Sequence, residues 1–240
     1  LSVIIPVYNE QTTIQAVIEK VMAVELPGIE REVVIADDGS TDSSPRVIEK
    51  VRDDHRPLVR VHTSLINLGK GAAIRYGLEY ATGDIAIIQD ADLELDPNEY
   101  GLLLRPILDG EADVVYGSRF KRPVANIPLR TRLGNRLLVL MTNLLFGTRL
   151  TDMETAYKVF RPSVVRRLKL RCVRFDIEPE LTARLLQSGQ RIVEVPISYN
   201  PRTTDEGKKI TWLDGFAALY TLLRCRLAAP VTALRLRSGV

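Results

Sequence analysis

The chain has 240 residues, of which 45% are hydrophobic and 26% charged, with a formal net charge of only +3. This is the composition of an ordinary globular protein that can bury a large core. The charge is too small to argue for a nucleic-acid partner, and no apolar run reaches the roughly 18 residues that span a bilayer.

The two cysteines, Cys172 and Cys225, lie far apart in the sequence. They match neither a disulfide framework nor a metal-ligand spacing, so we expect a reducing, cytoplasmic environment. The sequence opens directly on an apolar stretch, LSVIIP, without a signal-peptide pattern, which agrees with this expectation.

Short β-branched runs alternate with helical patterns over the first half of the chain. Strands are predicted at 1–5, 32–36, 58–62, 85–89 and 113–117, with helices at 12–24, 43–54, 71–83 and 97–108. This order predicts an α/β fold with a mostly parallel sheet between helices. In such sheets ligands bind beyond the carboxyl ends of the strands.

The alternation ends near residue 120. Beyond it the sequence predicts further helices at 132–147 and 176–189, strands at 157–161 and 191–199, and two amphipathic helices over 211–237 that are interrupted at Pro230.

The segment 85–97, IAIIQDADLELDP, follows a predicted strand with carboxylates at Asp90, Asp92, Glu94 and Asp96. In an extended stretch alternate side chains point the same way, so Asp90, Asp92 and Glu94 are expected to converge. Carboxylate oxygens suit Mg²⁺ or Mn²⁺, whose remaining ligands come from substrate phosphates and water. The alternative is a solvated acidic loop, and the ligand pattern of an EF-hand is absent.

Two other strand ends carry polar motifs. Asp37 and Asp38 begin DDGSTD, which fits a nucleobase pocket or a capped turn. Lys70 lies between glycines in NLGKG, at either an anion-binding corner or a simple helix start; the spacing is not that of a mononucleotide P-loop.

The second half offers further charged candidates. Asp152 and Glu154 in TDMETAYKVF suit a general base or a carboxylate that holds an arginine in place, and the sequence leaves both open. Glu178 and Glu180 are interpreted as charges in the first turn of a helix. Cations suited to phosphate contacts occur in weakly structured segments: Arg119, Arg130, Arg132, Arg202, Lys208 and Lys209.

These motifs, in this order, carry a resemblance: PVYNE, DDGSTD, NLGKGAA, QDADLELDP, GSR, TDMETAYKVF and VPISYNPRTTDEGKKITW. The chain resembles the family 2 glycosyltransferases of the GT-A fold, most closely the dolichyl-phosphate mannose synthase-like group. The resemblance implies a GT-A catalytic domain over 1–210 and an amphipathic helical tail over 211–240.

The resemblance also assigns roles to positions of this sequence. The DxD positions, Asp90 and Asp92, would bind the metal, and Glu94 occupies a position that often holds Gln. Arg119 would face the donor phosphates, and Asp152 lies near the usual catalytic carboxylate. The donor side would comprise Pro6, Tyr8, Glu10, Asp37, Asp38, Lys70, Asp90 and Ala91, and the acceptor phosphate would meet Arg132, Arg202, Lys208 and Lys209.

The implied reaction is an inverting transfer of a hexose from GDP-mannose or UDP-glucose to a polyprenyl phosphate, dependent on Mg²⁺ or Mn²⁺. An acceptor phosphate is already anionic at pH 7 and needs no strong base. A soluble sugar or glycan hydroxyl, the alternative acceptor, would need a general base such as Asp152. A further alternative is a nucleotide-sugar-binding module without turnover.

A lipid acceptor would also account for the apolar stretch 132–147, which begins with arginine. We expect peripheral contact with the cytoplasmic face of a membrane. The alternatives are packing against the core of the domain or contact within a homodimer.

Overall fold

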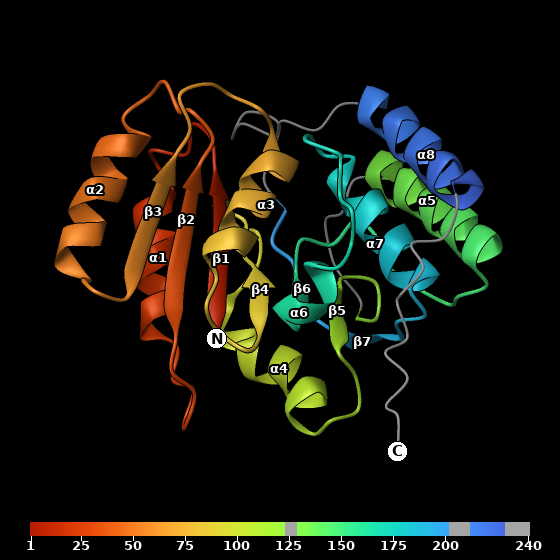
Figure 1. Ribbon diagram of the computed structural model, residues 1–240, viewed down its shortest axis with the longest axis horizontal. Helices are drawn as coiled ribbons and strands as arrows, with labels where there is room; N and C mark the ends of the chain where they lie inside the picture. Colours follow the sequence, from red (N-terminus) through yellow and green to blue (C-terminus); the bar gives the residue numbers. More distant parts are fainter. Residues whose placement is uncertain (123–128, 202–211, 229–240) are drawn as a thin grey trace, which may run out of the picture.

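The computed structural model describes residues 1–122, 129–201 and 212–228, and its centre is a twisted sheet flanked by helices (Figure 1). The order of the strands in the sheet is β3-β2-β1-β4-β6-β5-β7. All neighbouring strands are parallel except β6, which runs antiparallel to both β4 and β5. The strands are β1 Ser2–Val7, β2 Glu32–Asp37, β3 Val59–Thr63, β4 Ala86–Ile88, β5 Val114–Ser118, β6 Lys158–Phe160 and β7 Ile192–Pro196.

The helices connect these strands and cover the sheet on both faces (Figure 1). They are α1 Ile14–Ala23, α2 Ser44–Asp54, α3 Lys70–Tyr80, the 3-10 turn η1 Pro97–Glu99, α4 Tyr100–Leu108, α5 Leu129–Phe146, α6 Pro162–Val165, α7 Ile177–Gln187 and α8 Trp212–Leu227. Within the described ranges, no helix is long and apolar enough to cross a bilayer.

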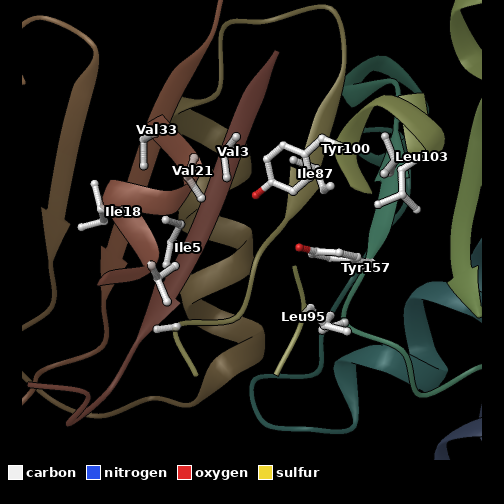
Figure 2. Close-up of a cluster of buried hydrophobic side chains, with 14 of the residues drawn as sticks. Val3, Ile5, Ile18, Val21, Val33, Ile87, Leu95, Tyr100, Leu103 and Tyr157 are labelled. Atoms are coloured by element: carbon white, nitrogen blue, oxygen red, sulfur yellow. The ribbon is translucent and has the colours of Figure 1, made fainter. Parts of the chain in front are cut away.

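Two apolar layers explain why the central strands are hydrophobic throughout. Every residue of β1 is buried. Val3 and Ile5 pack with α1, α2 and α4, whereas Ile4 faces the layer formed with α3, α6 and α7. Figure 2 shows part of the first layer, with Tyr100 and Tyr157 among the aliphatic side chains. A strand covered on both faces has no solvent-facing position for a polar residue.

The predicted α/β fold is confirmed, and the five predicted strands of the first half lie within two residues of β1 to β5. The predicted strands at 157–161 and 191–199 correspond to β6 and β7. The short α6 was not predicted. The second helix expected after Pro230 lies outside the described residues.

Helices α5 and α8 lie side by side and pack against α7 through a third apolar cluster (Figure 1). Its buried members are Leu138, Val139, Met153, Ala183, Ala218, Leu222 and Cys225. Residues 212–228, placed by sequence in a tail, therefore share a core with α5 and α7.

The third cluster makes a stability prediction. Leu222 is fully buried in it, whereas its neighbour Leu223 is 39% exposed. Leu222→Ala should lower the free energy of unfolding by about 2 to 5 kcal/mol, measured by urea denaturation, because it leaves a cavity. Leu223→Ala is the matched control and should cost under about 1 kcal/mol. Equal effects would mean that α8 does not pack as described.

Candidate active site

The carboxyl ends of β1 and β2 bring the first two motifs together. Val7 and Asp37 are partners in the parallel ladder. Beyond them the Asn9 amide donates to Ser40 Oγ at 3.0 Å, and the Glu10 amide donates to Ser44 Oγ at 2.8 Å. The PVYNE and DDGSTD segments therefore form one surface at the edge of the sheet where ligands bind in α/β folds.

The two adjacent aspartates have different environments. Asp38 accepts the amides of Leu68 at 2.9 Å and Gly69 at 2.6 Å, so both of its oxygens hold the loop before α3. Asp37 is 1% exposed and accepts the Ser40 amide through Oδ1. Its Oδ2 is buried without a hydrogen-bond partner among the described residues. The acceptor left over for a ligand thus belongs to Asp37.

The expected anion-binding corner at Lys70 is already occupied. Asp38 takes the amides of Leu68 and Gly69, the residues just before α3. Lys70 itself turns toward two carboxylates: its Nζ lies 2.8 Å from Asp90 Oδ1 and 3.1 Å from Glu178 Oε1. Burial alone would lower the pKa of Lys70, but the charges of Asp90 and Glu178 outweigh burial and hold the pKa well above its usual value.

The acidic loop after β4 starts from a fixed point. Gln89 is buried, and its Oε1 accepts the hydroxyls of Tyr100 and Tyr157, each at 2.8 Å. The side-chain Nε2 of Gln89 donates to the Asp90 backbone carbonyl at 3.0 Å. Two rigid aromatic side chains of the core thereby hold the first residue of the loop.

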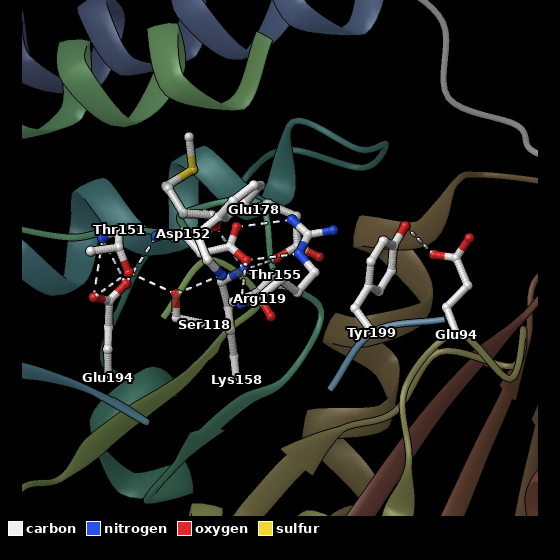
Figure 3. Close-up of polar contacts among 12 residues, drawn as sticks. Glu94, Ser118, Arg119, Thr151, Asp152, Thr155, Lys158, Glu178, Glu194 and Tyr199 are labelled. Carbon is white, nitrogen blue, oxygen red and sulfur yellow. Dashed lines mark hydrogen bonds and ion pairs between the residues drawn. The ribbon is translucent and has the colours of Figure 1, made fainter. Parts of the chain in front are cut away.

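The expected convergence of Asp90, Asp92 and Glu94 is not reproduced. β4 ends at Ile88, and Leu93 has a positive φ of 62°, so the loop is turned rather than extended. The Glu94 side chain accepts the Tyr199 hydroxyl at 2.9 Å (Figure 3). Within 1–122, 129–201 and 212–228 no group of three or more His, Cys, Asp or Glu side chains could hold a metal.

A divalent metal still fits the pair Asp90 and Asp92. Mg²⁺ and Mn²⁺ take one or two protein carboxylates and complete their coordination with phosphate oxygens and water. Both aspartates are partly exposed at the ligand-binding edge of the sheet. The Lys70 ammonium beside Asp90 shows that the site already attracts a cation.

Arg119 follows β5 and is fixed by Asp152 (Figure 3). The Asp152 carboxylate is fully buried and accepts Arg119 Nε at 2.7 Å, Nη2 at 2.9 Å and the Arg119 amide at 3.0 Å. Glu194 of β7 accepts the Asp152 amide at 3.0 Å. Of the two roles that the sequence left open for Asp152, this geometry favours holding an arginine over acting as a general base.

Glu154, the second carboxylate of that motif, is strongly perturbed. Burial first, and then the negative charge of Glu178, raises its pKa to about 7, although Lys158 and Arg119 act in the opposite direction. Its Oε1 is buried without a hydrogen-bond partner in the described structure. The partly buried Glu154 carboxyl thus holds its proton to a higher pH than an ordinary glutamate.

The other predicted residues are spread around this centre. Tyr8 is partly exposed after β1, and Arg132 is partly exposed near the start of α5. Pro6 is buried in β1, and the Ala91 side chain packs in the first apolar layer. The predicted acceptor residues Arg202, Lys208 and Lys209 lie outside the described residues.

Sequence reasoning missed three residues that organise the site. Glu178 does lie in the first turn of α7, as expected, but it is buried and contacts both Lys70 and Lys158. Tyr199 binds Glu94, and Arg119 lies 5.1 Å from the centre of its ring. Lys158 in the apolar run YKVF was the one available signal, since a lysine in a buried strand requires a partner.

The mostly parallel sheet, in which β6 runs antiparallel to β4 and β5, is that of the GT-A fold. The model of Glycosyl transferase family 2 matches residues 2–169, and the chain belongs to this family. It is an enzyme that transfers a sugar.

Three named glycosyltransferases align with most of the chain. The undecaprenyl-phosphate 4-deoxy-4-formamido-L-arabinose transferase of Edwardsiella ictaluri is 30% identical, over 100% of this chain and 72% of its own. The UDP-N-acetylglucosamine–dolichyl-phosphate N-acetylglucosaminyltransferase of Methanococcus voltae is 28% identical, over 93% and 95%. The chain spans only 33% of a third relative, glycosyltransferase AglD of Haloferax volcanii.

Among solved structures, glucosyl-3-phosphoglycerate synthase of Mycobacterium tuberculosis superimposes with a TM-score of 0.72 at 22% identity, covering 93% of this chain and 79% of that one. A second structure of that enzyme, with Mn²⁺, UDP and glucosyl-3-phosphoglycerate, has a TM-score of 0.70 at 21% identity, covering 93% and 78%. At these identities the likeness establishes the fold.

The raised pKa of Glu154 predicts a pH-dependent stability difference. The pKa of Glu154 rises from about 4.5 in the unfolded chain to about 7 in the fold, so ionising this partly buried side chain costs stability as the pH rises through this window. Relative to wild type, Glu154→Gln should gain about 3 kcal/mol in unfolding free energy between pH 4.5 and 8. Urea denaturation across this range measures the difference. Glu79→Gln, at an exposed position of α3, is the control, and parallel curves for wild type and Glu154→Gln would contradict the assignment.

Proposed function

We propose that the protein transfers a hexose, with inversion at the anomeric carbon, from a nucleotide-sugar to a polyprenyl phosphate in a metal-dependent reaction. The observation that carries the proposal is the fixed Arg119: buried Asp152 holds its guanidinium, which lies 5.1 Å from the centre of the Tyr199 ring, and the Tyr199 hydroxyl donates to Glu94 of the aspartate loop. The names of two relatives that align with more than nine tenths of the chain support the acceptor class, since both act on a polyprenyl or dolichyl phosphate.

The donor site would be built around Asp37. Its Oδ2 has no hydrogen-bond partner among the described residues and suits the ring N–H of uracil or guanine, so GDP-mannose and UDP-glucose are both candidate donors. The name of the Methanococcus voltae relative adds UDP-N-acetylglucosamine to the donors worth testing. Tyr8 and Glu10 lie on the same surface and would contact the ribose.

The diphosphate would lie between the aspartate loop and Arg119. Asp90 and Asp92 would hold Mg²⁺ or Mn²⁺, which supplies positive charge to the leaving nucleoside diphosphate; solved complexes of the structural neighbour contain Mn²⁺ and UDP. Arg119 adds a second positive charge on a preorganised side chain, so little reorganisation accompanies the reaction. Asp152 would be a positioning residue, because both of its oxygens are engaged with Arg119.

The acceptor phosphate oxygen would attack the anomeric carbon directly. This oxygen carries negative charge at neutral pH, so its attack needs no general base. The engagement of Asp152 with Arg119 is therefore compatible with transfer to a phosphate. Arg132 and the predicted cations Arg202, Lys208 and Lys209 would orient the acceptor phosphate.

One observation favours a second acceptor class. Burial and the negative charge of Glu178 raise the pKa of Glu154 to about 7, which would suit a general base for a sugar or glycan hydroxyl. Glu154→Gln separates the two: it should spare transfer to a phosphate and abolish transfer to a hydroxyl.

A lipid acceptor would require contact with a membrane, and two helices offer the surface. The large exposed apolar residues of α5 and α8 follow a spacing of four, three and four, which forms one stripe on each helix. These side chains are Leu133, Leu137, Leu140 and Leu144 on α5, and Phe216, Tyr220, Leu223 and Leu227 on α8. We call this set the α5–α8 surface, and we propose that it contacts the cytoplasmic face of a membrane peripherally.

Arginines border the α5–α8 surface. Arg132 and Arg136 flank the stripe of α5, and α5 contains no acidic residue. Arg224 and Arg226 flank the stripe of α8. Long cationic side chains beside an apolar stripe are typical of helices that lie in the interface of an anionic bilayer.

The proposed reaction is tested by labelling. Radiolabelled GDP-mannose, UDP-glucose and UDP-N-acetylglucosamine are each incubated with enzyme, Mg²⁺ or Mn²⁺, and a short polyprenyl phosphate, and label in the organic phase is counted. One donor should give metal-dependent lipid labelling. Asp92→Asn should lower the rate by about 100-fold or more, since it removes a charge that would bind the metal. Asp96→Asn, in the same loop, is the matched control. Donor turnover without labelled lipid would instead support a hydroxyl acceptor.

Membrane contact is tested by co-sedimentation with vesicles of phosphatidylglycerol and phosphatidylcholine. The wild-type protein should sediment with anionic vesicles, and Leu137→Glu/Tyr220→Glu should reduce the bound fraction by about tenfold or more. Leu108→Glu changes an equally exposed leucine on α4 and should have no effect. A wild-type protein that stays in the supernatant with the mass of a dimer would show that a second copy covers this surface.

A further inference from the structure

We propose that Lys70 is a built-in counter-ion of Asp90 that competes with the divalent metal. As a positioning residue, it would keep the affinity for free metal low, so that metal binds productively only together with the nucleoside diphosphate. The inference rests on the proposed function, because it presupposes that Asp90 and Asp92 hold the metal.

The first argument is the geometry at Asp90. Lys70 Nζ lies 2.8 Å from Asp90 Oδ1 and 2.9 Å from Oδ2, so one ammonium engages both oxygens of the carboxylate. A metal that takes an Asp90 oxygen must displace this ammonium or bind close to it, and either event opposes binding because like charges repel. At the neighbouring Asp92, Oδ1 accepts the Glu94 amide at 3.1 Å.

The second argument is that Lys70 is held in place from behind. Glu178 Oε1 lies 3.1 Å from Lys70 Nζ, and the Glu178 side chain is 5% exposed. Glu178 in turn contacts Lys158, which is fully buried and donates to the Met153 carbonyl at 3.1 Å. The four charges alternate in sign from Asp90 through Lys70 and Glu178 to Lys158, so the ammonium cannot leave without exposing two carboxylates to each other.

The third argument is that the backbone of Lys70 is also fixed. Asp38 accepts the Gly69 amide, and the Ala72 amide donates to the Val173 carbonyl at 3.1 Å. A Cβ on Gly69 would lie 2.4 Å from the Val173 carbonyl oxygen, and one on Gly71 would lie 2.7 Å from that of Cys172. The start of α3 is thus packed against the loop before α7, and glycine is required on both sides of Lys70.

A nucleoside diphosphate would change this balance. Its oxygens supply additional metal ligands, and its negative charge compensates the ammonium that remains nearby. With the diphosphate bound, the metal could then bind without displacing the Lys70 ammonium from Asp90. Free metal and metal with diphosphate should therefore respond differently to loss of the Lys70 charge.

The experiment measures Mn²⁺ binding directly, from the electron paramagnetic resonance signal of free Mn²⁺, with and without UDP or GDP. Without nucleotide, Lys70→Met should bind Mn²⁺ about tenfold more tightly than wild type, because the competing charge is gone. With nucleotide the difference should shrink to about threefold or less. Lys70→Arg keeps a cation and should restore wild-type affinity, and Lys50→Met on the exposed face of α2 is the control.

Thermal melting provides a second readout. Lys70→Met should melt below wild type, because Asp90 and Glu178 lose their shared cation, and Mn²⁺ should raise its melting temperature more than that of wild type. Should Lys70→Met fail to fold, Lys70→Gln replaces it, since its amide can still donate to a carboxylate.

The outcomes separate this inference from the proposed function. Equal or weaker Mn²⁺ binding by Lys70→Met, beside a wild type that binds Mn²⁺ with nucleotide, overturns the role of Lys70 alone. A wild type that binds no Mn²⁺ even with UDP or GDP overturns the metal-dependent function itself.

Discussion

A chain of alternating charges runs from partly exposed Asp90 through Lys70 to buried Glu178 and Lys158, and it connects four separate elements of the fold. Asp90 follows β4, Lys70 begins α3, Glu178 lies in α7 and Lys158 begins β6. Burying a lone charge costs several kcal/mol, so each member depends on the next for neutralisation. The loop that would bind metal is thereby coupled to the antiparallel strand and to α7, and it cannot move independently of them.

The same principle governs Arg119. Asp152 binds its guanidinium through two oxygens, and Glu194 holds the backbone at Asp152. Asp152, a candidate general base by residue type, thus serves as the fixed partner of a cation. Preorganisation of this kind suits a reaction whose main difficulty is a leaving group with high negative charge, because the positive groups are in position before the charge develops.

The sequence predicted the fold well because its signals are local and periodic: β1 to β5 are short apolar runs, and the helices between them have clear ends. The sequence identified the motifs of the site but not which side chains of these motifs contact one another. Glu94 was expected beside Asp90 and Asp92, but the left-handed Leu93 turns the chain and Tyr199, about a hundred residues away, binds the Glu94 carboxylate. Likewise, nothing local distinguishes the two adjacent aspartates. Asp38 binds backbone amides through both oxygens, whereas one oxygen of Asp37 has no hydrogen-bond partner in the part of the chain that the structure describes. Pairing across the fold is set by tertiary contacts, and periodicity carries no information about them.

The position of α5 and α8 gives the last connection between fold and chemistry. Both helices pack on α7, and the first turn of α7 holds Glu178, which contacts Lys70. A surface that contacts lipid through α5 and α8 would thus be joined through one rigid helix to the charges beside Asp90. A polyprenyl chain is insoluble in water, so its phosphate has to be met at the interface, and a rigid connection of this kind would fix the height of the donor site above the membrane. The apolar stripes would then position the anionic acceptor, and the charges beside Asp90 would position the anionic leaving group. A fixed distance between the two would allow transfer to a phosphate without a general base.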